Sequence, residues 1–346
     1  MTLDECLTYQ KALRTIEIGH RNFTATLDLS FTLASFKAPQ TVIMIVGPSK
    51  VGKSTVLRYL HQRLTERSAV HRDNDYTMLV VEGTNAVGGF FSTKHFTLDV
   101  LSKLRHPIFG SYSLDTDSYR PRLRAGEPDL RLALEKAIVH RKTHYLAVDE
   151  AHHLLYRTRG ENVTNVLDSL KCLGNTTSVV VILCGGFRLL TQGLESAHFD
   201  GRLHVVPFMN YGYSRKDTPD TDEFGRILEL LDKIMPVRPK QSLKDMQDFI
   251  HLECLGCVGL LIKWLERALA TLASTSKVKH LSKSVLEDAA MLDRQRDEIL
   301  ADIEIGLPLL SRTQQCDMEG YEARSRELKG RHVSPFQRKP VRDPVG

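Results

Sequence analysis

The sequence predicts an α/β domain, a parallel sheet covered by helices on both faces, followed by an all-helical domain. Short apolar, β-branched runs alternate with helical patterns up to about residue 215, which favours parallel strands joined by helices. From about Thr218 onward only helical patterns follow. The 346 residues are 42% hydrophobic, which is ordinary for a globular protein and enough to bury a core.

The elements are justified by their periodicity and their flanking residues. Residues 3–36 have apolar residues at helical spacing and predict one or two helices. The run VIMIV at 42–46 lies between Pro39 and Gly47 and is typical of a buried strand. Further strands are expected at 77–82, 143–148 and 178–184, and helices at 53–67, 95–104, 129–142, 161–173, 221–235, 243–253, 257–273 and 282–300. We therefore expect N-terminal helices over 1–36, a sheet domain over 37–215, a helical domain over 216–310 and a tail over 311–346.

The tail differs from the rest of the chain in composition. It is polar, and residues 321–346 contain seven Lys or Arg against three acidic residues, a net +4 out of +5 for the whole chain. Such a segment buries too little apolar surface to fold alone, so we expect it to be disordered until it binds a partner. The excess of positive charge in the tail says little about the folded body.

Composition also argues against export and against a membrane location. No run of eighteen apolar residues occurs, and the first twenty residues lack a basic start followed by an apolar stretch. The six cysteines are scattered, which is typical of reduced thiols. We expect a cytoplasmic protein.

A glycine-rich loop follows the first strand and satisfies the pattern G-x-x-x-x-G-K-[ST]. Its glycines let backbone N–H groups point at phosphate oxygens, its lysine neutralises the β- and γ-phosphates of ATP, and its hydroxyl residue ligates Mg²⁺. The loop lies between a strand and a helix, as this role requires. The predicted nucleotide-binding residues are Gly47, Pro48, Ser49, Lys50, Val51, Gly52, Lys53, Ser54 and Thr55, with Ser54 as a magnesium ligand.

An acidic pair, Asp149 and Glu150, ends the strand at 143–148. An aspartate there can hold Mg²⁺ through water, and the adjacent glutamate can polarise the attacking water. Together with Lys53 this pair predicts nucleotide hydrolysis. The letters D-E-A-H at 149–152 also occur in RNA helicases, but those enzymes need a second sheet domain, and only one sheet can be assembled here.

One phosphate-loop sheet followed by a helical lid is the plan of AAA+ ATPases. Within that plan the chain resembles the TniB/TnsC family of transposition ATPases, relatives of MuB, over about residues 20–300. The resemblance rests on several segments in the right order: VDEAHHLL at 148–155, NVLDSLKCLGN at 165–175, VVVILCGG at 179–186, GRLHVVPF at 201–208 and EFGRILELLDKIMPVRPKQSL at 223–243.

The resemblance implies roles for further residues. Arg202 matches the arginine finger that reaches the γ-phosphate of a neighbouring subunit, with Arg188 as the alternative. Lys263 follows a glycine-containing turn similar to the entry of the family's nucleotide-sensing lid helix. One position departs from the family. Gly186 stands where a polar sensor residue is usual, so hydrolysis is expected to be slow or to use another residue.

The resemblance also implies partners. Family members assemble with ATP as rings or helical filaments, about six or seven subunits per turn, around duplex DNA. They recruit a DDE transposase, connect to a TniQ-like targeting protein, and disassemble on hydrolysis. The basic tail could bind such a partner or DNA. The residues expected to contact DNA phosphates, without sequence preference, are Lys94, Ser111, Ser113, Arg120, Arg122 and Arg124.

The sequence leaves alternatives open. A loader for replication or secretion, similar to origin-recognition or ExeA-like ATPases, is a second class, and a nucleotide-bound scaffold that never hydrolyses is a third. Cys254 and Cys257 have zinc-like spacing but lack a second ligand pair, so ordinary thiols are expected. His152 and His153 are expected to pack or to shape the site rather than to bind a metal.

Overall fold

The chain is described from a computed structural model. The described residues are 2–36, 41–68, 75–83, 91–110, 125–155, 163–193, 203–214, 218–236, 242–274 and 280–314. They divide into two compact units, Met1–Gly306 and Leu307–Gly346. The second unit contributes only the last turns of one helix to the described residues, and the first unit contains the sheet and the other helices.

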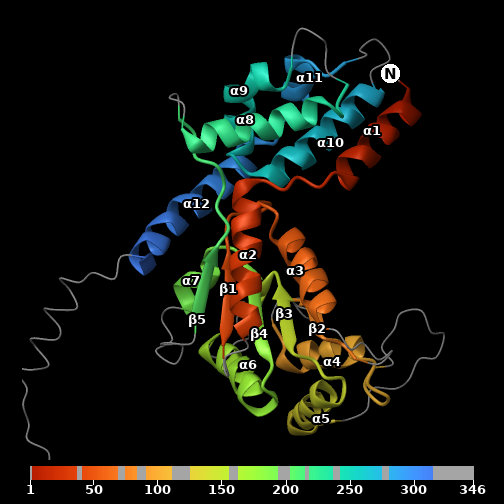
Figure 1. Cartoon of the computed structure of the whole chain (residues 1–346), viewed down its shortest axis with the longest axis vertical. Helices are drawn as coiled ribbons and strands as arrows, with labels where there is room; N and C mark the ends of the chain where they lie inside the picture. The colour runs from red at the N-terminus through yellow and green to blue at the C-terminus, as the bar shows by residue number, and fades with distance from the viewer. Residues whose placement is uncertain are drawn as a thin grey trace, which may run out of the picture. The chain divides into compact units, whose positions relative to one another are not determined.

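The centre of the first unit is a five-stranded parallel sheet (Figure 1). The strand order is β2-β3-β4-β1-β5. After β1 the chain crosses to the far edge at β2, returns through β3 and β4 to the side of β1, and adds β5 on the other side of β1. The prediction of a parallel α/β sheet is confirmed. The strands are β1 (Val42–Val46), β2 (Met78–Glu82), β3 (Tyr145–Asp149), β4 (Val180–Gly185) and β5 (Leu203–Pro207).

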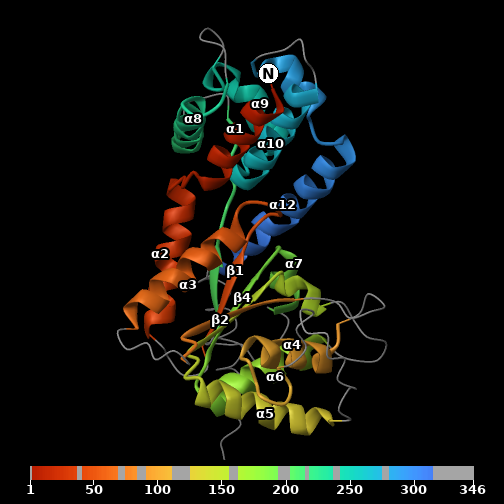
Figure 2. The same cartoon turned by 90° about the vertical axis from the view of Figure 1, so that its right-hand side faces the viewer.

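Helices cover both faces of the sheet (Figure 2). One face packs against α2 (Arg21–Phe36) and α3 (Lys53–Arg67). Alternate residues of each strand point to this side, and Ile43 and Ile45 of β1 lie in one apolar cluster with Leu57 of α3. The other face carries α4 (Thr93–Lys103), α5 (Glu127–His140) and α6 (Val163–Thr177). This two-sided burial explains why the strands read as continuous apolar runs.

The all-helical part has an apolar core of its own. The first helix of the chain, α1, packs on α10 in this core, far along the sequence from the other helices there. Trp264 lies buried in the core, and its indole Nε1 donates a hydrogen bond to the carbonyl of Leu286 at 3.0 Å. The helices are α1 (Leu3–Thr15), α8 (Pro219–Asp232), η3 (Lys244–Met246), α9 (Gln247–Cys254), α10 (Val258–Ser274), α11 (Lys283–Asp288) and α12 (Asp293–Gln314).

One expectation about the helices is wrong, and one further helix was not expected. The single helix expected at 282–300 is two helices, α11 and α12. At the end of α11 the amide of Ala290 bonds to the carbonyl of Glu287, three residues back, and the Leu286 carbonyl accepts from Trp264. The second difference is α7 (Arg188–Gly193), which was not expected because its six residues are too few for a periodic pattern.

The thiols of Cys254 and Cys257 are buried in this helical core. Burial raises the pKa of Cys254 well above its ordinary value and that of Cys257 to about 12. Both are therefore neutral thiols at neutral pH. None of the described helices is long and apolar enough to cross a membrane.

Candidate functional site

The glycine-rich loop connects β1 to α3, as expected. Its lysine, Lys53, is 7% exposed, and its ammonium donates to the carbonyls of Gly47 at 3.0 Å and Pro48 at 2.8 Å. The amide of Val51 bonds to Pro48, which closes the turn that also contains Ser49. The loop is thus wrapped around the end of its own lysine.

The backbone of the loop fits a phosphate. Among the described residues, no acceptor bonds to the N–H groups of Gly52, Lys53 and Ser54, which begin α3. Lys50 and Gly52 have positive φ angles of 63° and 121°, which turn successive amides in one direction. Three such donors at a helix N-terminus, beside a lysine ammonium, form an anion site.

A cavity of about 850 Å³ opens in front of this loop. It brings together Lys50 to Thr55, Glu150 at the end of β3 and Lys263 of α10, which are distant in sequence but were all predicted to bind or hydrolyse nucleotide. Gly47, Pro48, Ser49 and Asp149 are not among its lining residues. The cavity is large enough for a nucleotide, since ligand pockets typically measure about 300–1,000 Å³.

Residues of the N-terminal helices also line the cavity, and the sequence did not point to them. His20, Phe23, Tyr59 and Phe208 form a continuous set of rings, with centroids 5.5 to 6.3 Å apart in each contacting pair. A planar base can stack or pack against such a surface. Arg58, whose guanidinium lies 5.2 Å from the Tyr59 ring centroid, adds a cation. In the sequence, only the i, i+3 and i+4 spacing of Thr55, Arg58 and Tyr59 indicates that these side chains share one face of α3.

His20 predicts a loss of stability in acid. The amide of Phe23 donates to its Nδ1, which also lies 2.9 Å from the hydroxyl of Tyr211. Burial lowers the pKa of His20 to about 4. The folded state thus favours the neutral ring, so its contribution is complete above the unfolded pKa and is lost as pH falls from about 6.5 toward 4. We expect roughly 2 kcal/mol of unfolding free energy to be lost between pH 7 and pH 5 from this group.

Urea unfolding at the two pH values measures this effect. His20→Gln keeps a polar side chain that does not titrate, so its unfolding free energy should change less with pH than that of the wild type. Equal pH dependence in the two proteins would contradict the assignment. The pKa of His152 is lowered in the same way, but His152 titrates in both proteins, so its effect cancels in the comparison.

The acidic pair ends β3 as the sequence predicts. The Asp149 carboxylate accepts a hydrogen bond from the amide of Glu150 at 2.9 Å. Glu150 adopts a left-handed φ of 49°, which is uncommon outside glycine and turns its side chain away from the strand direction. A residue held in this way is typical of functional sites. Glu150 lines the cavity, and 40% of its side chain is exposed.

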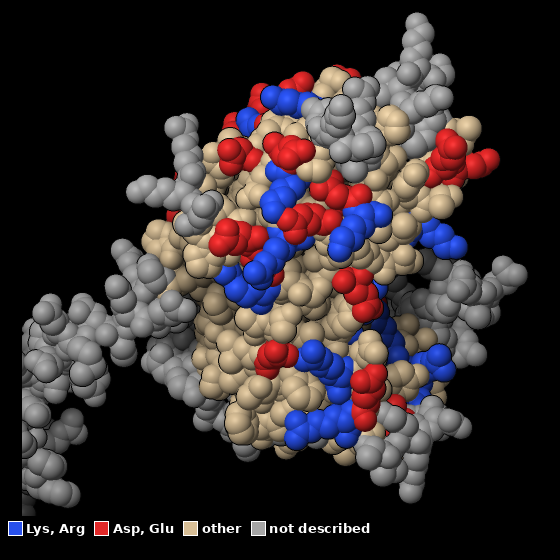
Figure 3. Space-filling model, turned by 45° about the horizontal axis from the view of Figure 1, so that its top comes forward, with Lys and Arg blue, Asp and Glu red and all other residues tan. Residues whose placement is uncertain are grey.

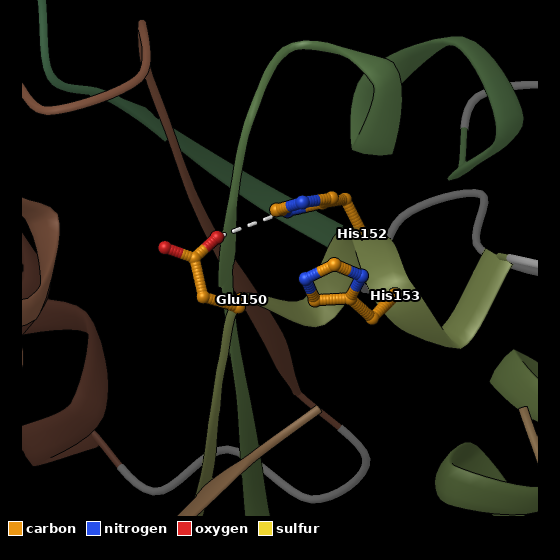
Figure 4. A group of neighbouring side chains, drawn as sticks. All are labelled: Glu150, His152 and His153. Atoms are coloured by element: carbon orange, nitrogen blue, oxygen red, sulfur yellow. Dashed lines mark ion pairs between the residues drawn. The ribbon is translucent and has the colours of Figure 1, made fainter. Parts of the chain in front are cut away.

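His152 and His153 follow on the short helix η1 (Ala151–Leu155). Figure 4 shows the Glu150 carboxylate pointing toward the ring of His152, with Oε2 3.2 Å from Nδ1, and the two imidazoles side by side. Burial, then the charges of His153 and Lys53, lower the pKa of His152 to about 4, so the ring is neutral near pH 7. The contact orients Glu150 without neutralising it. The three residues could also ligate a cation, since their ligand atoms lie within 4.8 Å of one another.

The oxygens predicted to hold Mg²⁺ suit this ion. Ser54 presents an exposed hydroxyl at the start of α3, and Asp149 a partly exposed carboxylate at the end of β3. Hydroxyl and carboxylate oxygens are the ligands that magnesium prefers, usually together with water and substrate phosphates. The ion would shield the phosphate charges of a bound nucleotide.

The lid touches the phosphate loop through a glycine, which allows a direct test. A Cβ atom on Gly259 of α10 would lie 2.3 Å from the carbonyl oxygen of Lys50. Gly259→Ala should therefore push α10 away from the loop and weaken nucleotide binding about tenfold, or about 1.4 kcal/mol. Titration with a fluorescent ATP analogue measures the effect. In Gly126→Ala the new methyl meets only side-chain atoms 3.5 Å away, so affinity should not change.

Other predicted residues lie apart from this cavity or outside the described residues. Lys94, expected to contact DNA, is exposed on α4 and donates to the carbonyl of Ala125 at 3.0 Å. Arg188 begins α7, three residues after the end of β4. The residues that lie outside the described part of the chain are the predicted arginine finger Arg202 and the predicted DNA contacts Ser111, Ser113, Arg120, Arg122 and Arg124.

The solved structures to which this chain is similar include three that match at low identity. Drosophila ORC bound to DNA is 14% identical, with a TM-score of 0.48 over 82% of this chain and 65% of that one. The Aeropyrum pernix ORC2 protein in its ADP form is 16% identical, with a TM-score of 0.49 over 75% and 67%. Cdc6p from Pyrobaculum aerophilum is 15% identical, with a TM-score of 0.48 over 76% and 65%. This chain thus spans just under two thirds of the Drosophila and Pyrobaculum chains.

No curated protein matches the sequence significantly. One family model does: residues 37–192 match the model described as AAA domain. This range contains β1 to β4, the glycine-rich loop and the acidic pair. The chain therefore contains an AAA domain over residues 37–192.

Proposed function

We propose that this chain is an ATPase that uses Mg²⁺ and whose nucleotide joins copies of the chain on duplex DNA. The observation that carries the proposal is one cavity that holds the phosphate-loop amides, Glu150 and the lid residue Lys263. The phosphate-loop amides bind the phosphates, Glu150 activates a water, and Lys263 lets the lid sense the nucleotide. Together these parts make up an ATP switch.

The proposed reaction is hydrolysis of the γ-phosphate. Lys53 and the loop amides bind the phosphates, and Ser54 and Asp149 hold the magnesium ion, which supplies charge neutralisation. Glu150 accepts a proton from the attacking water. Asp149 is the last residue of β3 and Glu150 follows it, while Lys53 comes after β1 of the same parallel sheet, so all three lie at the carboxyl edge of the sheet.

We further propose that the protein regulates DNA transposition. The support is the ordered set of segments similar to TniB/TnsC ATPases, several of which flank this cavity or lie in the lid. In this role ATP-bound subunits assemble on duplex DNA, recruit a DDE transposase, connect to a TniQ-like protein, and leave after hydrolysis. The physical reason is that a γ-phosphate contacted by Arg202 of the next subunit links the two subunits. Loss of the γ-phosphate therefore weakens the interface between them.

Electron microscopy of the full chain with magnesium, ATP and long duplex DNA tests the assembly. Rings or filaments should form with ATP and DNA, and should be absent with ADP or without nucleotide. A protein that stays monomeric with saturating ATP and DNA would contradict the switch. Assembly with ATP but no phosphate release would instead favour the scaffold that never hydrolyses, which is consistent with the glycine at position 186.

DNA contact should depend on salt and on Lys94. On the face drawn in Figure 3, acidic and basic side chains are intermixed. Lys94→Glu should weaken DNA binding at low salt and lower the slope of log K against log salt by about 0.9 for each phosphate that is no longer neutralised. Lys136→Glu, an exposed lysine of α5, is the matched control. If log K changed with log salt by the same slope in the two variants, Lys94 would not contact DNA.

A further inference from the structure

Two glycines, Gly185 and Gly186, stand at the end of β4, near the candidate site. In the sheet β4 lies between β3, which ends in the acidic pair, and β1, which leads into the phosphate loop. Gly185 pairs with Val46 of β1, and a Cβ on Gly185 would lie 3.2 Å from the backbone nitrogen of His152. Gly186 follows directly. The end of β4 thus lies between the strand that ends in the acidic pair and the strand that leads into the phosphate loop, and Gly185 and Gly186 bring no side chain to this place.

A carboxylate from another element approaches this place. A Cβ on Gly186 would lie 3.8 Å from Oδ2 of Asp302 in α12, at ordinary van der Waals distance. Asp302 is half-buried, and burial raises its pKa, while the positive charges of Lys53 and Arg188 act in the opposite direction. The side chain therefore lies within electrostatic reach of the phosphate-loop lysine, although it is 249 positions further along the chain.

The packing of α12 fits this placement. Ile299 and Ile303 are buried in the helical core, one helical turn apart. Asp302 and Gly306 are also one turn apart and face the end of β4, because a Cβ on Gly306 would lie 2.2 Å from the ring of Phe187. Phe187 is fully buried. Only glycine admits so close an approach, so one face of α12 joins the lid core while the neighbouring face rests on Phe187, just after β4.

We propose that Asp302 is a positioning residue for ATP hydrolysis, supplied by α12 to the place where β4 lacks a polar side chain. The inference rests on the proposed ATPase function. The Asp302 carboxylate accepts a hydrogen bond from the attacking water and holds it for Glu150. The water oxygen bonds to the γ-phosphorus, its proton passes to Glu150, and the bond to the β–γ bridging oxygen breaks with its electron pair leaving on ADP.

The nearby cations make a carboxylate compatible with a triphosphate. Asp302 alone would repel the phosphates, but the positive charges of Lys53 and Arg188 offset part of that repulsion. If Asp302 instead acted as a block that ATP must displace, removing it would raise nucleotide affinity and turnover. The two roles therefore predict effects of opposite sign.

Steady-state hydrolysis of ATP by the full chain distinguishes a positioning role of Asp302 from a blocking role. Asp302→Ala should lower kcat at least about tenfold and leave KM within about threefold, because the interaction is made mainly in the transition state. Adding Gly186→Thr to Asp302→Ala supplies a hydroxyl at the same place and should restore at least part of kcat. Asp297→Ala, which removes an exposed acid from the same helix, is the matched control and should change neither constant.

Melting temperatures establish whether the variants fold. If Asp302→Ala does not fold, Asp302→Asn replaces it in the kinetic test. Its amide oxygen still accepts from water, so its kcat should remain above a third of the wild-type value, whereas a charge block predicts a rise. A kcat unchanged or increased in Asp302→Ala, or not restored by Gly186→Thr, overturns the inference and leaves the ATPase intact. A wild type that binds ATP but releases no phosphate overturns the proposed hydrolysis itself, and with it this role.

Discussion

Lys53→Ala is expected to weaken ATP binding by about a hundredfold or more, which corresponds to about 2.8 kcal/mol. The ammonium of Lys53 is buried at the centre of the phosphate loop and bonds to two carbonyls of that loop. Its charge-assisted bonds to phosphate oxygens would form in a site with little water, where each contributes about 1.5–3 kcal/mol. No other lysine has this place at the start of α3.

Equilibrium titration with a fluorescent ATP analogue measures this loss. Lys136→Ala removes an exposed lysine from α5, outside the cavity, and should bind nucleotide as the wild type does. Circular dichroism should show that both variants fold, since the carbonyls of Gly47 and Pro48 can bond to water once the ammonium is absent. If Lys53→Ala bound ATP within threefold of the wild type, the loop would not be the phosphate site.

Glu150→Gln is expected to reduce ATP hydrolysis by about a hundredfold or more while leaving ATP affinity nearly unchanged. The amide has the shape of the carboxylate and can keep its contact with His152, but it cannot accept a proton from water at neutral pH. Glu150 lies at the cavity wall and not in the phosphate loop, so binding does not depend on its charge. Assemblies on DNA should then persist, because the γ-phosphate stays in place.

Phosphate release and the lifetime of the DNA complex measure the two effects. Glu82→Gln is the matched control: Glu82 ends β2 in register with Asp149, at the same edge of the sheet, but does not line the cavity. Its hydrolysis rate should equal that of the wild type. Normal hydrolysis by Glu150→Gln would show that another group accepts the proton, and the acidic pair would lose its proposed role.

The local parts of this site follow from the sequence. Each predicted strand lies within two residues of its observed position, because continuous apolar runs between turn residues have few other places to be buried. The phosphate loop is equally local, since its glycines, lysine and hydroxyls are neighbours along the chain, and its function depends on that spacing. The position of Asp149 and Glu150 at a strand end was predictable for the same reason.

What only the tertiary structure decided is how distant segments meet around that loop. The hydrophobic periodicity of the N-terminal helices predicts helices but not which surfaces they cover, so His20 and Phe23 in the cavity wall could not be predicted. Likewise the sequence marks Gly186 as a position without a polar side chain, and says nothing of Asp302. A periodic pattern reports which side of a helix is buried. The partner of that side is set by packing of the whole unit, in which Gly306 lets α12 approach Phe187.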